Sequence, residues 1–184
     1  MGVWKKIWKF LWESNSIWSW IASLAIVFIL IIGIFFPLMR LTFSTSLPLV
    51  VIESQSMAHK YSYDEWYSNC SWYQDHNISK EEFKQWSFHN GLYMGDIILV
   101  KGEKEYKKGD VIIFQTQQTT PIIHRKVLEN PTSTKGDNNC YQLSQEKEIS
   151  QDKIIGKAVL RIPWLGWAKL IFVEIGKVLI SIFQ

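Results

Sequence analysis

The sequence has few cysteines, and their placement argues against a metal centre. Only two occur among the 184 residues, Cys70 and Cys140, and they lie far apart. A structural zinc site needs Cys or His residues clustered at short spacing, so we expect no metal and no cofactor. If the domain that contains them is extracytoplasmic, the two thiols can form a disulfide, and two free thiols are the alternative.

The chain also lacks a strong excess of charge of either sign. Twenty Lys and Arg stand against 17 Asp and Glu, which gives a formal net charge of +3. That bias is too small to argue for a nucleic-acid partner. We find no phosphate-binding loop and no internal repeat. Composition therefore favours one modest domain with additional segments.

Charge is absent altogether between Ser14 and Met39. A helix of roughly 25 apolar residues is long enough to cross a hydrocarbon core of about 30 Å. A cleaved signal peptide would have a shorter apolar core followed by a small-residue cleavage site, which this segment lacks. The sequence therefore predicts a retained transmembrane anchor over residues 14–40.

Residues 1–13 combine apolar and basic side chains at helical spacing. The apolar positions are Trp4, Ile7, Trp8, Leu11 and Trp12, and the lysines fall mostly elsewhere. This pattern predicts an amphipathic helix on the membrane surface, and a plain extension of the anchor is the alternative. Three lysines precede the anchor and only Arg40 follows closely, so the positive-inside rule predicts a cytoplasmic N-terminus and an extracytoplasmic domain after residue 40.

Short runs of β-branched residues dominate the segment 45–163, which we predict to be a mainly β domain. The expected strands are 47–53, 96–101, 110–115, 121–127 and 154–162. Residues 59–90 interrupt them as a polar and aromatic insert with helix-like stretches, one opened by a capping box of Ser79 and Glu82. Residues 164–184 form an apolar segment that contains three charges. It predicts a helix at the membrane interface or against a partner, with a second membrane span as the alternative.

Three polar residues in the domain have the chemistry of an acyl-transfer site. Ser56 follows the first predicted strand, His124 ends the Pro-Ile-Ile run, and Asp137 sits in a Lys-Gly-Asp-Asn turn. A serine hydroxyl needs a neighbouring base to become nucleophilic, and a neutral imidazole can serve. A carboxylate on the other imidazole nitrogen would fix its tautomer. Each residue alone is more often an ordinary loop, core or turn residue.

Seven short blocks follow one another through the chain. They are Ser-Gln-Ser-Met at 54–57, Gly-Asp-Ile-Ile at 95–98, Gly-Asp-Val-Ile-Ile-Phe at 109–114, Pro-Ile-Ile-His-Arg at 121–125, Thr-Lys-Gly-Asp-Asn-Asn at 134–139, Ile-Gly-Lys-Ala-Val at 155–159 and Ile-Pro-Trp-Leu-Gly at 162–166. In this order, and together with the predicted anchor, they resemble the type I signal peptidases, specifically their archaeal and endoplasmic-reticulum branch, over roughly residues 17–170.

The resemblance implies a role for each candidate residue. Ser56 would be the nucleophile and His124 the general base, in place of the lysine of the bacterial enzymes. The Ser54 hydroxyl and the Ser56 backbone N–H would form the oxyanion hole. Asp137 matches the first of two aspartates of the family. The substrates would be exported precursor proteins with small side chains near the scissile bond.

The chain departs from the family pattern in three places. Gln55 stands where the family has glycine, and Ala58-His59 replaces Glu-Pro. The second aspartate position is Leu143, so the orienting acid is Asp137 or an acid that this pattern does not identify. The insert 59–90 is the third departure, and it could cap the cleft or contact a partner.

These observations predict a membrane-bound serine endopeptidase that cleaves signal peptides, located in the cell membrane with its catalytic domain outside. Its partners would be precursor proteins, the lipid bilayer and, optionally, subunits of a secretion or processing complex, but not nucleic acid. Two alternatives remain open at this point. One is a catalytically inactive scaffold subunit on the same fold, and the other is a receptor-type anchor with a coincidental triad.

Overall fold

The computed structural model describes residues 2–182, which divide into two compact units. The first unit ends at Thr42 and the second begins at Phe43. The first is helical. The second contains a six-stranded sheet and all the residues singled out above for chemistry.

The first unit consists of a short helix, a break and a long helix. Helix α1 (Val3–Trp8) continues as the π-helical turn η1 (Lys9–Glu13), and the backbone becomes extended at Ser14. Helix α2 (Ile17–Leu30) starts after Ser16, whose hydroxyl accepts a hydrogen bond from the Trp18 N–H. It runs through the π-helical turn η2 (Ile31–Phe35) into α3 (Phe36–Phe43).

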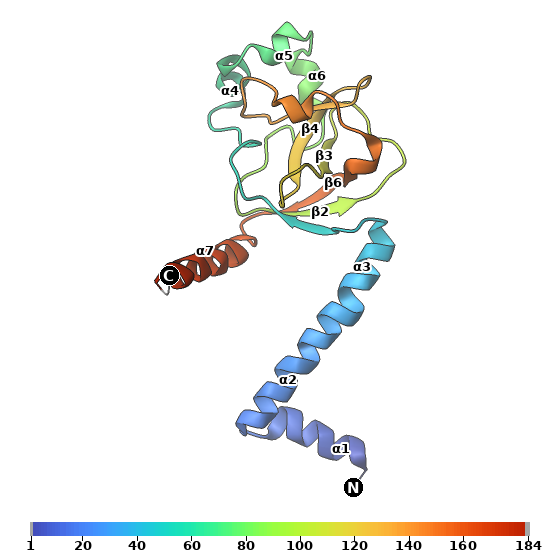
Figure 1. Cartoon of the computed structure of the whole chain (residues 1–184), viewed down its shortest axis with the longest axis vertical. Helices are drawn as coiled ribbons and strands as arrows, with labels where there is room; N and C mark the ends of the chain where they lie inside the picture. The colour runs from blue at the N-terminus through green and yellow to red at the C-terminus, as the bar shows by residue number, and fades with distance from the viewer. Residues whose placement is uncertain (1, 183–184) are drawn as a thin grey trace. The chain divides into compact units, whose positions relative to one another are not determined.

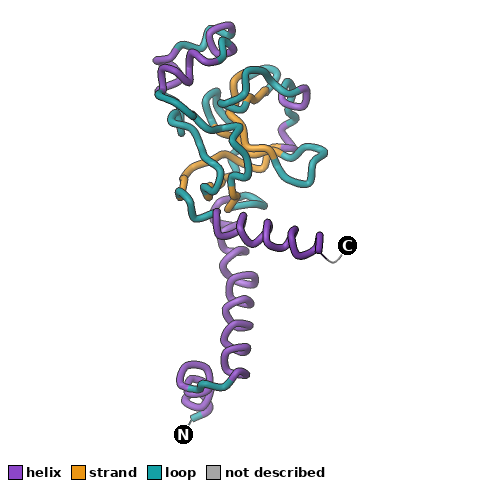
Figure 2. The backbone as a smooth tube through the Cα atoms, turned by 90° about the vertical axis from the view of Figure 1, so that its left-hand side faces the viewer, coloured by secondary structure: helices purple, strands orange, loops and turns teal. Residues whose placement is uncertain are grey.

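A break in the helix separates the N-terminal segment from the long helix. Ser19 and Ser23 of α2 both donate hydrogen bonds to the carbonyl of Leu11, at 3.3 and 3.2 Å. Figure 2 shows α1 turned away from the line of the long helix. Residues 3–13 therefore form a helical segment of their own, and residue 1 of the predicted segment lies outside the described residues.

The long helix Ile17–Phe43 is the only helix among the described residues that is long and apolar enough to cross a membrane. Its 27 residues correspond to about 40 Å of helix at 1.5 Å per residue. It begins three residues after the predicted start because Ser14-Asn15-Ser16 forms the break and the cap. It ends at Phe43, beyond the predicted end at residue 40.

The second unit is built on one antiparallel sheet with the strand order β1-β2-β6-β3-β4-β5. The strands are β1 (Leu49–Val51), β2 (Ile97–Lys101), β3 (Val111–Phe114), β4 (Ile122–Leu128), β5 (Ser133–Lys135) and β6 (Ile154–Ile162). Every predicted strand is present, although β1 is shorter than the predicted 47–53. Strand β5 was not predicted, because Ser-Thr-Lys has no apolar alternation and is held by its pairing with β4.

The predicted sheet is present, but the unit also contains several helices and is mixed α/β, so the prediction of a mainly β domain is only partly correct. The insert 59–90 folds into α4 (Tyr63–Asn69), α5 (Trp72–Asp75) and α6 (Lys80–Lys84). Ser62 and Glu65 form a full capping box on α4, and Ser79 caps α6 by accepting from the Glu82 N–H at 3.0 Å. Figure 1 shows these helices grouped at one end of the unit, away from α7.

Three buried apolar clusters hold the unit together, and the smallest contains Tyr106, Ile112, Phe114 and Ile149. The first is aliphatic and lies against the sheet, where Ile52, Met57, Leu92, Ile98, Val100, Val111, Ile113 and Ala158 are buried. The second is aromatic and belongs to the insert, with Trp66, Tyr67, Trp72, Tyr73, Ile78 and Phe83 packed on Val127 of β4. The insert thus has its own apolar core, which packs on Val127 of β4, the strand that also contains His124.

The C-terminal segment forms helix α7 (Trp167–Ile182), and residues 183–184 of the predicted segment lie outside the described residues. Its first residue packs on Gly95, which has a φ of +89°. A Cβ there would lie 2.2 Å from the Trp167 indole nitrogen, so only glycine permits this contact. The contact fixes the start of α7 against the sheet.

Cys70 and Cys140 form a disulfide, which settles the alternative left open by the sequence. The bond joins the end of α4 in the insert to the loop after β5, across 70 residues of sequence. The two Cα atoms are 5.1 Å apart, within the range common for disulfides. The insert is therefore covalently attached to the loop that contains Asp137.

We expect removal of this disulfide to lower stability substantially. A cross-link that closes a loop of this length restricts the unfolded chain, which is typically worth about 2–4 kcal/mol. The double variant Cys70→Ser/Cys140→Ser should therefore unfold at lower denaturant concentration in micelles, with a free energy of unfolding smaller by about that amount. Wild type treated with a reductant is the control, and an unchanged midpoint in both samples would contradict the expectation.

Candidate active site

Ser56 lies in a tight turn just beyond the edge strand β1. The Ala58 N–H donates to the Gln55 carbonyl at 3.0 Å, which closes the turn, and the side chain of Met57 is buried in the aliphatic cluster. This leaves the Ser56 side chain half-buried, with its hydroxyl directed at β4. The turn therefore leaves the Ser56 hydroxyl accessible, while the buried Met57 side chain holds the adjacent backbone in place.

His124 meets Ser56 across the unit, although 68 residues separate them in sequence. Its side chain is 4% exposed, and its backbone pairs with Ile112 of β3. The Nε2 atom lies 2.9 Å from the Ser56 Oγ. That separation is within hydrogen-bonding distance and suits transfer of the hydroxyl proton to the imidazole.

Glu146, which the sequence analysis did not single out, occupies the other side of the imidazole. It ends the 3₁₀ turn η3 (Ser144–Glu146) and is fully buried. Its Oε1 is hydrogen-bonded to Nδ1 of His124, and its Oε2 accepts from the Leu143 N–H at 2.7 Å. This carboxylate therefore favours the tautomer in which Nδ1 is protonated and Nε2 is free to accept a proton.

Asp137, the acid predicted from the motif, does not contact His124. Its carboxylate is buried against Arg125, whose Nε and Nη2 donate to it at 2.9 and 2.7 Å. The Tyr73 hydroxyl and Nε2 of His59 complete the shell, at 2.8 and 3.1 Å. The expectation that Asp137 orients the base must therefore be corrected, because its oxygens are already used by other partners.

One feature of the sequence points to Glu146, although Glu146 lies outside the motifs that were matched. Leu143 stands at the second aspartate position, and Glu146 is the first acid after it. A short 3₁₀ turn brings that side chain back over the Leu143 N–H. The carboxylate thus reaches the imidazole from three residues downstream, which a position-by-position comparison does not detect.

The two groups predicted for an oxyanion hole are neighbours. The Ser54 Oγ lies 3.0 Å from the Ser56 Oγ, and the Ser56 N–H points to the Ser54 Oγ at 3.4 Å. Ser54 is exposed, so its hydroxyl can rotate toward a bound carbonyl oxygen. In this structure the Ser56 N–H is directed at the Ser54 hydroxyl, so an oxyanion that used both donors would take the place of that contact.

A cleft of about 760 Å³ opens over Ser56 and His124. One wall is the segment 49–54, and the facing wall is the segment 118–124 that leads into β4. Leu143, Gln145 and Lys169 complete the lining. The free edge of strand β1 borders the cleft and could pair with an extended peptide.

His59 has a place that the sequence did not predict. The residue is 6% exposed, and its ring is stacked on Trp66 with centroids 3.5 Å apart. Its Nε2 faces Asp137, and its Nδ1 is buried without a hydrogen-bond partner. A second proton on the ring would have no acceptor, so the neutral form fits this site.

Burial and neighbouring charges shift the titration of this region. Burial lowers the pKa of His59, and the hydrogen bond to Asp137 offsets only part of that effect. Burial alone would raise the pKa of Asp137, but the charge of Arg125 and the bonds from His59 and Arg125 hold it well below its usual range. Burial also lowers the pKa of Lys135 to about 8. Asp137 and Arg125 are therefore both charged at neutral pH.

Within residues 2–182, no group of three or more His, Cys, Asp or Glu side chains is arranged to hold a metal ion. Comparison with protein-family models and with curated proteins finds no match to this chain.

The shifted pKa of His59 predicts a loss of stability in mild acid. As the pH falls through about 6.5, the unfolded chain binds a proton that folded His59 resists, so the free energy of unfolding should fall by up to about 1.4 kcal/mol per pH unit. Denaturation in micelles at pH 7.5 and pH 5.5 measures this loss.

His59→Gln, which keeps a donor toward Asp137 but cannot titrate, should flatten that pH dependence. His76→Gln is the control, because His76 is exposed and the variant should retain the wild-type slope. Equal slopes for His59→Gln and wild type would show that another group is responsible.

Proposed function

We propose that the chain is a membrane-anchored serine endopeptidase that removes signal peptides from exported precursor proteins. The observation that carries this proposal is the line of hydrogen bonds from Ser56 through His124 to the buried Glu146, with Ser56 and His124 lining a cleft beside the edge strand β1. The ordered blocks that resemble the signal peptidases supply the substrate class.

The chemistry follows from the three side chains. The Ser56 hydroxyl attacks the scissile carbonyl carbon while its proton passes to Nε2 of His124, and Glu146 stabilises the resulting imidazolium. The oxyanion accepts hydrogen bonds from the Ser54 hydroxyl and the Ser56 N–H. The imidazolium then gives its proton to the leaving amine as the C–N bond breaks. Water, deprotonated by His124, hydrolyses the ester and restores Ser56.

Substrate would bind as an added strand. Strand β1 pairs with β2 on one side, and its other edge borders the cleft. A peptide laid along that edge would find main-chain partners on the segment leading to Ser56, with alternate side chains directed into the cleft. Specificity for small side chains next to the scissile bond is the part of this proposal that rests on the family resemblance.

The long apolar helix supports the membrane location. A helix of this length and composition would anchor the chain in the bilayer. Lys5, Lys6 and Lys9 precede it and only Arg40 lies in its last turn, which favours a cytoplasmic N-terminus and an active site on the outer side. Signal peptides of translocated precursors emerge on that side.

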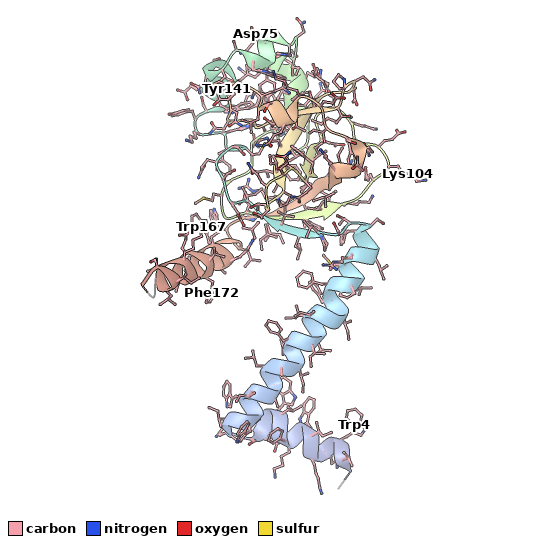
Figure 3. The ribbon with its side chains drawn as sticks, in the orientation of Figure 1. Trp4, Asp75, Lys104, Tyr141, Trp167 and Phe172 are labelled. Carbon is pink, nitrogen blue, oxygen red and sulfur yellow. A yellow bond between two sulfur atoms is a disulfide. The ribbon has the colours of Figure 1, made fainter. Side chains whose placement is uncertain are left out.

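Helix α7 fits an interfacial role better than a second span. Lys169, Glu174 and Lys177 lie along it, and each charge placed inside the hydrocarbon core would cost a few kcal/mol. Lys169 pairs with Glu53 at 2.8 Å, which holds the first turn beside the cleft. Figure 3 shows Trp167 at the base of this helix and Phe172 farther along it, where the Phe172 side chain is 77% exposed. A lipid surface would cover such apolar side chains.

The alternative function, an inactive scaffold subunit, rests on the absence of the family's second aspartate, at Leu143. Glu146 supplies a carboxylate to the imidazole from another position, which removes that motivation. A scaffold would also have no need of a serine hydroxyl 2.9 Å from an imidazole nitrogen beside an open cleft. Peptide hydrolysis is therefore the function that the geometry supports best.

Substitution of the three hydrogen-bonded residues tests the proposal. Ser56→Ala and His124→Ala should abolish cleavage of a model precursor in micelles, because the nucleophile or its base is lost. Glu146→Gln should lower kcat by roughly 10³- to 10⁴-fold with the fold intact, since an amide no longer fixes the reactive tautomer.

Asp137→Asn is the matched comparison for Glu146→Gln. It leaves Arg125 buried with reduced charge compensation, so it should lower the unfolding midpoint, and it should lower kcat far less than Glu146→Gln does. Full activity in Glu146→Gln together with loss in stably folded Asp137→Asn would return Asp137 to the role of orienting acid. No cleavage by wild type, and no labelling of Ser56 by an acylating probe, would favour the scaffold.

The depth of α7 in the bilayer is measurable with a fluorophore. A polarity-sensitive dye on Phe172→Cys in reconstituted vesicles should be quenched by lipids brominated near the headgroup more than by lipids brominated at the chain end. The same dye on Lys104→Cys, an exposed loop position, should be quenched by neither. Strong quenching by chain-end bromines would support a second span instead.

A further inference from the structure

The insert 59–90 lies behind the cleft and not over it. No described residue of this segment lines the cleft, whose walls come from residues 47–57, 118–124, 139–145 and 169. The insert cannot act as a lid in this arrangement. Its aromatic core rests instead on Val127 and its polar groups converge on Asp137.

Three side chains of the insert bind Asp137 from one side. The Tyr73 hydroxyl donates to Oδ1 at 2.8 Å, and Nε2 of His59 lies 3.1 Å from Oδ2. The Trp66 indole N–H donates to the Asp137 backbone carbonyl at 3.2 Å. The insert therefore holds both the carboxylate and the main chain of this residue.

The other side of the same turn holds the catalytic pair. The Asn138 N–H donates to the Ser56 carbonyl at 2.8 Å, and its side-chain amide donates to the Gln55 carbonyl at 3.1 Å. A Cβ on Gly136 would lie 2.8 Å from Nε2 of His124, so the glycine backbone packs directly on the imidazole. A shift of this turn would change the distance between Ser56 and His124.

We infer that the insert is an internal clamp, and that His59 and Tyr73 are positioning residues that set the Ser56–His124 geometry through Asp137. The inference rests on the proposed function. It concerns two departures from the signal-peptidase pattern: the insert 59–90, and His59 at its start, where that pattern has a proline. Neither residue contacts the cleft, so both act on catalysis and not on substrate binding.

Conservative variants of the two residues test the clamp. Tyr73→Phe removes one hydrogen bond to Asp137, and His59→Leu removes the other while filling the space. Each should lower kcat on a model precursor by roughly 10-fold or more with KM changed less than twofold, because small displacements of catalytic groups are costly. His59→Gln, which can still donate, should recover most of the loss.

Tyr67→Phe is the matched control. Tyr67 belongs to the same aromatic cluster, but its hydroxyl donates to the Ile78 carbonyl at 2.6 Å, within the insert. This variant should cost a similar amount of folding stability and leave kcat at the wild-type value. If Tyr67→Phe and Tyr73→Phe lower kcat equally in folded protein, the clamp is wrong and the insert is merely structural.

Nitrogen NMR of the histidine rings separates this inference from the proposed function. In ¹⁵N-histidine-labelled full chain in micelles, Tyr73→Phe should shift the ring resonances of His124, and Tyr67→Phe should leave them in place. Failure of wild type to cleave any precursor would contradict the proposed function, and the His124 shifts would still decide the clamp. Unmoved His124 resonances in both Tyr73→Phe and His59→Leu would overturn it.

Discussion

The buried ion pair between Arg125 and Asp137 is the interaction on which the β domain and its insert both depend. All five guanidinium N–H groups of Arg125 have acceptors: the Asp137 carboxylate and the carbonyls of Ser87, Phe88 and Gly109. Removing two charges from water is costly unless such bonds replace the lost hydration. These acceptors lie at the end of the insert, in the turn before β3 and in the loop after β5. Arg125 therefore holds three separate chain segments in place.

The proposed triad of Ser56, His124 and Glu146 needs no buried ion pair to hold it, because ordinary secondary structure positions each member. Strand β4 fixes His124, a tight turn beside the aliphatic core fixes Ser56, and a single 3₁₀ turn delivers Glu146. The imidazole is nearly buried while the hydroxyl remains reachable from the cleft. In the proposed reaction, this arrangement would keep the imidazole base away from bulk water and leave the serine hydroxyl open to a peptide.

Sequence patterns predicted the parts of this fold that depend on local alternation of side chains. The strand 154–162 has the predicted bounds, and Ser56 and His124 lie within hydrogen-bonding distance as their motifs suggested. Strand β5 escaped prediction because its pairing with β4 and not its composition makes it a strand. Glu146 and the burial of His59 escaped because both depend on contacts between segments far apart in sequence, which single-residue motifs do not encode.

The bridge between Cys70 and Cys140 gives the domain a dependence on its chemical surroundings. A disulfide forms by exchange with other thiols, so the folding equilibrium is linked to the redox poise of the compartment in which the chain folds. Before oxidation, the loop after β5 is joined to the insert by non-covalent contacts alone. Maturation on the oxidising side of a membrane would thus couple the completion of the fold to export of the domain itself.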